Sequence, residues 1–381
     1  MPNLRQGCPG KFSAFFRDRA EKCFKLVKNI QRPGRKGGIF RETTKQSYMK
    51  KISFIAILIL AATSLLAQEK RMAVVGTSTC YMRLMPDYES ALETQELMGT
   101  VVEIVGENGY WREIVSPQPY QAWTTEKTLV EMTEEELKAY EDAPKYIYTA
   151  PYGHIYTTPT KNNPSAITDL VGGDVLRIAQ KVKGSSGQSG KHGKWVEVIL
   201  PSGQRGWVLK KDVRPLGERI DIRKGDLAEG LVSPEQIEAV IRQAYSLRGV
   251  PYLWGGMSSK GVDCSGLVRI SFLMNDILLP RNASQQVFCG KAVEVPRPDI
   301  AGRSQEEVKA GYDMETALNA IRNLHRGDLV FFGNTSTGGI THVGIYLGEG
   351  QMIHASHLVR INSLIPGNEN YYENAHRLIK A

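Results

Sequence analysis

Two stretches of the chain alternate apolar and polar residues and are broken by turn residues every few positions. Their glycine, apolar and tryptophan residues recur at matched spacing. The matched positions are Gly99, Val101, Ile104, Gly109, Trp111, Glu113, Ile114, Pro117 and Trp123 in the first copy, and Gly173, Val175, Ile178, Gly193, Trp195, Glu197, Val198, Pro201 and Trp207 in the second. Half-buried strands of this kind need a closed barrel, so the pattern predicts two small β-barrels, at about 69–130 and 144–216. Between them, TEEELKAYEDA predicts a short acidic helix.

The last third of the chain shows helical spacing first and strand-like runs afterwards. Ser233 to Gln236 form a capping box, and apolar residues follow at helical spacing up to Gly249. A second helix is expected after Cys264. The strand-like runs are GDLVFF at 327–332, THVGIYLG at 341–348 and GQMIHAS at 350–356. Helices followed by an antiparallel sheet predict an α+β domain over 217–381.

Residues 49–67 have the pattern of a secretory signal peptide. A start-like Met49 and two lysines precede an apolar run from Ile52 to Leu66, and small and polar residues follow. This run is shorter than the roughly 20 residues of a membrane-spanning helix, so we expect no stable membrane insertion after signal removal. We therefore expect residues 1–67 to be a leader and the protein to be exported to the periplasm.

The positive charge of the chain is concentrated in this leader. The formal net charge is +8, but residues 1–67 hold 14 of the 48 Lys and Arg and only 3 of the 40 Asp and Glu. The remainder has 34 basic and 37 acidic residues. This balance argues against a nucleic-acid partner.

Three cysteines follow the leader: Cys80, Cys264 and Cys289. An odd number in an oxidising compartment leaves at least one thiol unpaired. For Cys80 and Cys289 a buried, unreactive thiol is the simpler interpretation. Cys264 follows a glycine-rich loop at the expected start of a helix. Helix N-termini lower the pKa of a thiol, so Cys264 is a candidate nucleophile.

Two histidines stand where a general base is needed. His342 opens one expected strand and His354 lies on the next, with a GEG turn at 348–350 between them. In an even register both imidazoles share one face of the sheet, so His354 can fix the tautomer of His342. We expect Val343 and Ile345 to face the core and His342 to point from the other face toward the Cys264 helix.

These motifs together resemble a known family. PYLWGG, GVDCSGLV, LPRNASQQ, GDLVFF, THVGIYLG and MIHAS resemble the NlpC-type cell-wall peptidases, which are papain-like cysteine enzymes. The resemblance covers about 233–381. The two repeats ahead of it resemble bacterial SH3-like domains, an order found in a subgroup of γ-D-glutamyl-L-diamino acid endopeptidases. It implies two small SH3-like β-barrels followed by an α+β papain-like catalytic domain.

The resemblance also implies roles for individual residues. Cys264 would be the nucleophile, His342 the base, His354 its orienting partner, and Tyr252 a residue on the oxyanion side. The implied substrate contacts are Asp263, Ser265, Trp254, Ser284, Arg281 and Tyr120. Structural alternatives stay open for four of these six residues. They are a helix cap for Asp263, an ion pair for Arg281 and core packing for Trp254 and Tyr120.

The implied activity is hydrolysis of the γ-D-glutamyl-diamino acid bond of murein peptides that have a free N-terminal L-Ala. The partners are then peptidoglycan stem peptides, and we expect a monomer. A muramoyl-alanine amidase on the same scaffold and a non-catalytic wall-binding protein remain alternatives. The sequence has no phosphate loop, dinucleotide fingerprint or HExxH motif, so no cofactor is implied. The span 287–326 looks longer than usual for the family and would be a lid, a partner surface or a plain insertion.

Overall fold

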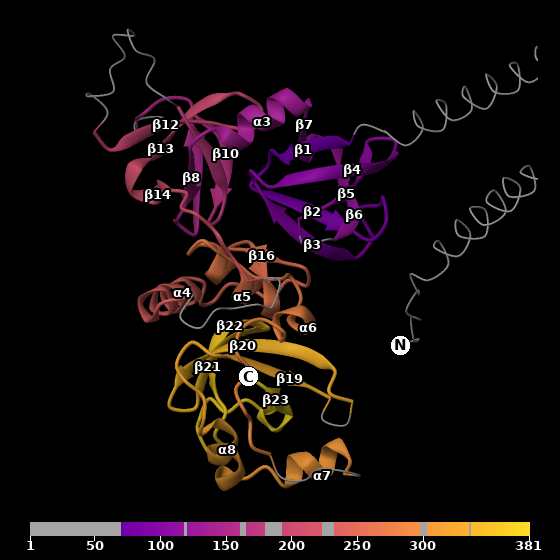
Figure 1. Cartoon of the computed structure of the whole chain (residues 1–381), viewed down its shortest axis with the longest axis vertical. Helices are drawn as coiled ribbons and strands as arrows, with labels where there is room; N and C mark the ends of the chain where they lie inside the picture. The colour runs from indigo at the N-terminus through magenta and orange to yellow at the C-terminus, as the bar shows by residue number, and fades with distance from the viewer. Residues whose placement is uncertain are drawn as a thin grey trace, which may run out of the picture. The chain divides into compact units, whose positions relative to one another are not determined.

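The computed structural model describes residues 70–117, 120–160, 165–179, 193–222, 232–297, 303–334 and 337–381. The expected leader and signal peptide, 1–67, lie outside these residues. Residues 70–381 form one compact unit (Figure 1). Within the described residues, we find no helix that is both long and apolar enough to span a bilayer.

The first repeat forms an antiparallel sheet with the strand order β3-β2-β6-β5-β4-β1-β7. Its strands are β1 (Arg71–Val75), β2 (Thr79–Arg83), β3 (Leu92–Leu97), β4 (Val101–Asn108), β5 (Trp111–Val115), β6 (Gln121–Thr125) and β7 (Leu129–Met132), with a 3-10 turn at Glu126–Thr128. Apolar side chains that alternate along these strands form one core, which includes Val75, Met82 and Ile114. This arrangement positions β3 and its polar side chains beside the C-terminal region.

The second repeat has the same topology. Its strands are β8 (Lys145–Tyr148), β9 (Tyr152–Tyr156), β10 (Ala166–Val171), β11 (Val175–Ile178), β12 (Trp195–Ile199), β13 (Arg205–Leu209) and β14 (Val213–Pro215). Their order, β10-β9-β13-β12-β11-β8-β14, is the first order shifted by seven strands. The internal repeat is therefore confirmed. Both sheets keep two edge strands in this order, so closure into barrels is not confirmed.

The connecting acidic helix is confirmed as α3 (Glu134–Asp142). Thr133 and Glu136 form a reciprocal capping box at its start, which satisfies two of the backbone N–H groups that a helix start leaves unpaired. Three glutamates in the first turn also suit the positive end of the helix dipole.

The C-terminal region is α+β, as predicted. Its helices are α4 (Pro234–Ser246), α5 (Cys264–Leu273), α6 (Ala283–Gln286), α7 (Gln305–Ala310) and α8 (Met314–Ile321). Five antiparallel strands form the main sheet in the order β22-β21-β20-β19-β23. They are β19 (Leu329–Gly333), β20 (Ile340–Gly348), β21 (Gln351–Ser356), β22 (Leu358–Ser363) and β23 (Leu378–Lys380). The short strands are β15 (Ile220–Asp221), β16 (Met257–Ser258), β17 (Gly261–Val262) and β18 (Ile277–Leu278).

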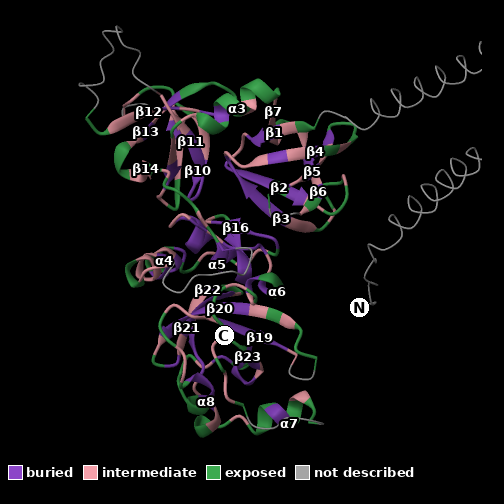
Figure 2. Ribbon diagram, in the orientation of Figure 1, coloured by how far each residue is buried: buried purple, intermediate pink, exposed green. Residues whose placement is uncertain are grey.

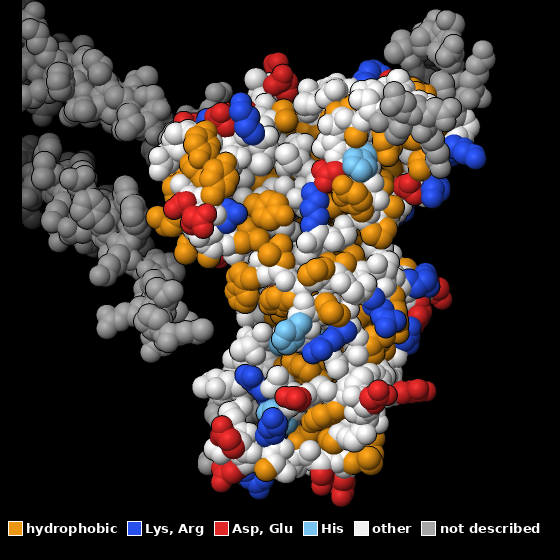
Figure 3. Space-filling view, turned by 180° about the vertical axis from the view of Figure 1, so that it is seen from behind, with side chains coloured by type: hydrophobic (Ala, Val, Ile, Leu, Met, Phe, Trp, Pro, Cys, Tyr) orange, Lys and Arg blue, Asp and Glu red, His pale blue; other side chains and the backbone are white. Residues whose placement is uncertain are grey.

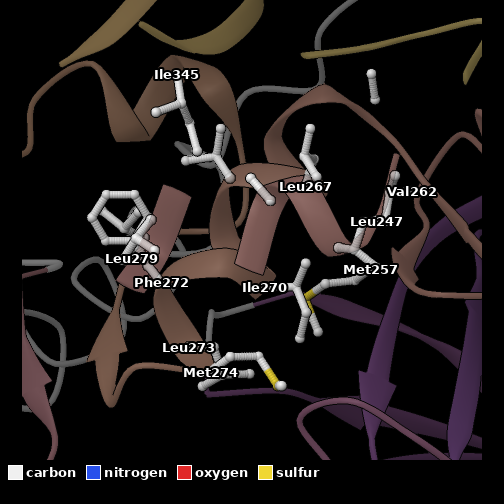
Figure 4. Packing of buried hydrophobic residues seen from close by; sticks show 14 of the residues in the cluster. Leu247, Met257, Val262, Leu267, Ile270, Phe272, Leu273, Met274, Leu279 and Ile345 are labelled. Atoms are coloured by element: carbon white, nitrogen blue, oxygen red, sulfur yellow. The ribbon is translucent and has the colours of Figure 1, made fainter. Parts of the chain in front are cut away.

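Helix α5 is buried along its whole length (Figure 2). Its apolar side chains pack with α4 and with one face of the main sheet, including Val343 and Ile345 of β20. Figure 4 shows Leu267 and Ile270 of α5 within this cluster. Leu267 is fully buried, and truncating such a leucine to alanine costs roughly 2–5 kcal/mol. The start of α5 is therefore held rigidly against the sheet.

The second face of the main sheet is also a core, which corrects one prediction. Phe332, Tyr346 and Met352 pack there with Ala320 and Ile321 of α8. His342 lies on this second face, beside the ring of Phe332, and not on the face that packs against α5. The alternation itself is confirmed, since Val343 and Ile345 lie on one face and His342 on the other. The expectation that the His342 face turns toward the Cys264 helix was wrong, because α8 of the 287–326 span covers that face. In this span, α8 is a structural cover of the sheet.

Charges of both signs are spread over the surface. On the face shown in Figure 3, Lys and Arg side chains alternate with Asp and Glu and form no continuous basic band.

Candidate active site

A capped helix start presents Cys264. Asp263 is the N-cap of α5, and its Oδ1 accepts the backbone N–H of Gly266 at 2.7 Å. A Cβ at position 266 would lie 2.1 Å from the carbonyl oxygen of Gly256, so this approach requires glycine. The glycine-rich loop and the DCSG sequence thus pack backbone against backbone. Cys264 becomes the first residue of α5, where backbone N–H groups lack helical partners.

Burial dominates the chemistry of the Cys264 thiol. The residue is 8% exposed. Removal from water raises the pKa of the thiol to about 11, and the nearby Asp263 charge acts in the same direction. Hydrogen bonds from the backbone N–H groups of Val343 and Ser265 lower the pKa but do not reverse the shift. The backbone N–H at the helix start therefore acts in the predicted direction, but burial outweighs it and the expected net lowering of the pKa is wrong for the resting site.

The contact with Val343 also locates the thiol relative to β20. Val343 directly follows His342, so the sulfur lies beside the backbone of the candidate base. In the pairing of β20 with β21, the pair nearest to Val343 is Ile345 with Ile353. Val343 itself is not part of that pairing. The sulfur therefore contacts the peptide group that joins His342 to Val343.

His342 and His354 are joined directly, which confirms that they share a face. Nε2 of His342 lies 2.7 Å from Nδ1 of His354. The rings meet edge to face, with 5.0 Å between their centroids. Gly344 makes room for this contact, because a Cβ there would lie 3.2 Å from Cβ of His354.

Both imidazoles are neutral at neutral pH. Burial, together with the neighbouring His354 and Arg377, lowers the pKa of His342 to about 3. Burial also lowers the pKa of His354 to about 4, against a hydrogen bond with Asn362 that raises it. The resting site therefore pairs a neutral thiol with a neutral imidazole. Such a base accepts the thiol proton as the sulfur attacks.

The candidate base His342 and the predicted oxyanion residue Tyr252 line an open pocket of about 600 Å³. Its lining residues are Tyr252, Thr341, His342, Ala355, Ser356, His357, Tyr372 and Arg377. Burial raises the pKa of the Tyr252 phenol to about 12, and the charge of Cys264 acts on the same group. Tyr252 thus lies within electrostatic reach of the thiol and at the edge of a space that a substrate can enter.

Comparison with known proteins identifies this region. Residues 249–378 match the NlpC/P60 family. The C-terminal region is an NlpC/P60 domain.

Two named relatives show how far the similarity extends. Gamma-D-glutamyl-L-lysine dipeptidyl-peptidase of Bacillus cereus is 26% identical over 296 residues, which cover 74% of this chain and 72% of that protein. Peptidoglycan endopeptidase RipB of Mycobacterium tuberculosis is 38% identical over 135 residues, 32% of this chain and 44% of that protein. The first similarity therefore extends beyond the NlpC/P60 domain into the β-rich repeats.

A solved structure shares the fold. The crystal structure of an NlpC/P60 family protein from Bacillus cereus superimposes with a TM-score of 0.57 at 22% identity. The match covers 80% of this chain and 97% of that one, so it includes the β-rich sheets as well as the NlpC/P60 domain.

A buried ion pair underlies the start of α5 in the NlpC/P60 domain. Arg281 is 2% exposed, and its Nη1 and Nη2 donate to Oδ1 and Oδ2 of Asp263 at 3.0 and 2.7 Å. Ser265 Oγ lies 3.0 Å from Nη1, and Thr94 of β3 accepts from Nε at 2.9 Å. The helix-cap role of Asp263 and the ion-pair role of Arg281 are thus both present. A substrate contact for either residue stays a prediction.

The remaining three predicted substrate residues are exposed or half-buried. Trp254 is 67% exposed, so the core-packing alternative is wrong for it. Ser284 is exposed on α6. Tyr120 is half-buried: it packs against the first core, and its hydroxyl hydrogen-bonds the side chain of Asn282. None of the three lines the 600 Å³ pocket.

The sequence analysis missed residues that act through hydrogen bonds. Asn362 Oδ1 lies 2.8 Å from Nε2 of His354, and Tyr372 places its ring 4.9 Å from that of His354. Thr94 and Gln95 of β3 bond to Arg281 and to the backbone N–H of Met257. Only the strand pairing and the packing of β3 reveal these contacts. No motif marks them in the sequence.

The other two described cysteines form no disulfide bond. Cys80 is fully buried in the first core, and burial raises the pKa of its thiol to about 11 although Thr124 and Thr128 hydrogen-bond it. Burial likewise raises the pKa of the half-buried Cys289 to about 11. The interpretation of Cys80 as a buried thiol is confirmed, and Cys289 is only partly buried.

Proposed function

We propose that the chain is a cysteine endopeptidase that hydrolyses the γ-D-glutamyl-diamino acid bond of murein peptides. One arrangement carries the proposal: the Cys264 sulfur lies beside the backbone of His342, whose ring is held by His354. The relative from Bacillus cereus, whose name gives a γ-D-glutamyl-L-lysine bond, matches most of both chains and supports this substrate class. Lysine and diaminopimelate both remain open at the diamino position.

The catalytic roles follow from the chemistry of the site. His342 takes the proton of the Cys264 thiol while the sulfur attacks the γ-carbonyl carbon of D-glutamate. The resulting imidazolium gives that proton to the departing amine of the diamino acid, which leaves an acyl-enzyme. Water, deprotonated by His342, then releases the D-glutamyl product and restores the thiol. Tyr252 and backbone N–H groups at the start of α5 stabilise the oxyanion of each tetrahedral intermediate.

The β-rich repeats are the second part of the proposal. We infer that 69–130 and 144–216 are two SH3-like domains and that 217–381 is the catalytic domain. The identical strand order of the two sheets supports a duplicated domain. Several contacts to the NlpC/P60 domain support a role of the first repeat in the site: Arg281 with Thr94, Met257 with Gln95, and Asn282 with Tyr120.

Substrate length is the third part. Tyr120 lies at the junction beside Asp263 and Arg281, where it would close the end of the groove that holds the N-terminus of the peptide. A peptide with a free N-terminal L-Ala fits such a closed end, and a muramic-acid-linked stem peptide does not. Asp263, Ser265, Trp254 and Ser284 would line the same end. The signal peptide at 49–67, the periplasmic location and the monomeric state stay predictions.

Digestion of defined muropeptides tests the function. The purified protein should release the diamino-acid product from L-Ala-γ-D-Glu-diamino acid peptides, as read by mass spectrometry. Cys264→Ala should abolish release, and the matched Cys289→Ala variant should not. An amidase would instead free the stem peptide from muramic acid. Binding to sacculi without any peptide release would favour the wall-binding alternative.

A further inference from the structure

Asn362 of β22 is the third side chain in a series of hydrogen bonds that runs from His342 through His354. Its side chain is 7% exposed and contacts two groups. Nδ2 donates to the backbone carbonyl of Asn370 at 2.6 Å, and Oδ1 lies 2.8 Å from Nε2 of His354. A carbonyl oxygen only accepts hydrogen bonds, so the amide nitrogen must face Asn370. The amide oxygen then faces His354.

The orientation of this amide dictates the tautomer of His354. An amide oxygen also only accepts, so Nε2 of His354 must carry the hydrogen. His354 is neutral because burial lowers its pKa, and a neutral imidazole has one N–H. Nδ1 of His354 is therefore bare and accepts from Nε2 of His342 across 2.7 Å.

The same reasoning fixes the tautomer of His342. Its Nε2 carries a hydrogen that it donates to His354, and the ring is neutral, so Nδ1 is bare. Nδ1 is the ring nitrogen nearer the backbone. The Cys264 sulfur contacts the N–H of Val343, the next backbone N–H. The bare nitrogen is thus on the side from which the thiol proton arrives.

We propose that Asn362, held by the Asn370 carbonyl, is a positioning residue that sets the tautomers of His354 and His342 and so keeps Nδ1 of His342 free for the thiol proton. This inference rests on the proposed function. It concerns a residue beyond the Cys264, His342 and His354 set. A reversed amide would reverse both tautomers, and His342 would then present an N–H to the thiol and lose its function as a base.

The charged groups near the two histidine rings cannot replace Asn362 as the hydrogen-bond acceptor of His354. The charged groups that act on the two rings are Arg377 and Arg360, and guanidinium groups donate but do not accept. The Asn370 carbonyl is itself fixed, because it also accepts the backbone N–H of Ser363 at 2.9 Å. Nδ2 of Asn370 in turn donates to Oε1 of Gln351 at 3.0 Å. The Asn370 carbonyl that orients the Asn362 amide is therefore held in place by its own hydrogen bonds.

Nitrogen NMR of the imidazoles tests the inference without substrate. The chain has seven histidines, which ¹⁵N-histidine labelling and single-residue variants assign. Long-range ¹H–¹⁵N spectra separate protonated from bare ring nitrogens. In the unmodified protein, His342 and His354 should both show a protonated Nε2 and a bare Nδ1. A protonated Nδ1 on either ring overturns the proposal, whatever the protein cleaves.

The matched variants are Asn362→Leu and Asn368→Leu. Asn368 is an exposed amide that bonds to Ser363 and does not contact the histidines. Asn362→Leu should lower kcat roughly 10²- to 10⁴-fold with little change in KM, the pattern of a wrong tautomer, and should weaken the signal of the bare His342 Nδ1. Asn368→Leu should change neither. An Asn362→Leu protein with native kcat and native histidine spectra overturns the proposal. If this variant does not fold, the spectrum of the unmodified protein still decides the question.

Discussion

Arg281 holds both carboxylate oxygens of Asp263, the residue that caps the helix of the candidate nucleophile. Both side chains are almost fully removed from water. Breaking such a pair leaves one charge buried without a partner. This pair therefore connects the stability of the domain with the position of Cys264.

Replacing Arg281 by methionine should lower the free energy of unfolding by about 3–5 kcal/mol, because the Asp263 charge stays buried. Urea unfolding followed by circular dichroism measures this. The control is Arg326→Met, which breaks an Arg-Glu pair of similar geometry with Glu238 that is about two-fifths exposed. That change also removes a hydrogen bond to the Leu347 carbonyl, and it should cost no more than about 2 kcal/mol in total. Equal losses of unfolding free energy in the two variants would show that burial of the Arg281–Asp263 pair does not increase its effect on stability.

The alkylation rate should report how far the Cys264 thiol is deprotonated in the enzyme without substrate. Since burial raises the pKa of Cys264 to about 11, the thiolate fraction is small at neutral pH and grows as the pH rises. The iodoacetamide rate at Cys264, followed by peptide mass spectrometry, should therefore climb steadily through the alkaline range. Cys80, which is fully buried, should stay unlabelled until the protein unfolds. A rate at Cys264 that is already constant from mildly acidic to mildly alkaline pH would indicate a thiolate-imidazolium pair instead.

The sequence predicted the chemistry of the site better than its geometry. The DCSG helix start and the two histidines were found because each follows a local rule, a cap before a helix or alternation along a strand. The identical topology of the repeats was equally visible in matched glycines and tryptophans. These features depend on residues close together in the chain.

The features that the sequence missed depend on long-range packing. Thr94 meets Arg281 across 187 positions, and no local pattern announces such a contact. Alternation gave the correct face for His342 but not the element that covers it, because α8 and not the Cys264 helix packs on that side of the sheet. The direction of the Cys264 pKa shift was also wrong, because local rules show the helix start but not the depth of burial.

Acid should destabilise the fold through the histidine pair. Burial lowers the folded-state pKa of His342 to about 3 and of His354 to about 4, below the value of about 6.5 for an unfolded histidine. Between these values the unfolded chain binds more protons, so the stability present above pH 6.5 is lost as the pH falls. His354 alone should account for roughly 3 kcal/mol of this loss.

Chemical unfolding at a series of pH values checks this expectation. His354→Gln should flatten the decline in the free energy of unfolding between about pH 6.5 and pH 4. The control His325→Gln changes an exposed histidine and should leave the decline unchanged. A decline of the same size in all three proteins would assign the acid sensitivity to groups other than the His342 and His354 pair.

Tyr120 should control which substrates enter the site. Its ring packs against the core of the first repeat, and its hydroxyl bonds to Asn282 at the start of α6. Tyr120→Ala removes the ring that closes the proposed N-terminal end of the groove. The variant should therefore cut muramic-acid-linked stem peptides that the unmodified enzyme leaves intact, while it still cuts free L-Ala peptides. Tyr120→Phe keeps the ring and removes only the hydrogen bond to Asn282, so it should retain the selectivity.

Mass spectrometry of both substrate types separates these outcomes, and thermal unfolding shows how far Tyr120→Ala weakens the first core. Unchanged selectivity in a folded Tyr120→Ala protein would place the length control elsewhere, because no other part of this side chain remains to block the groove.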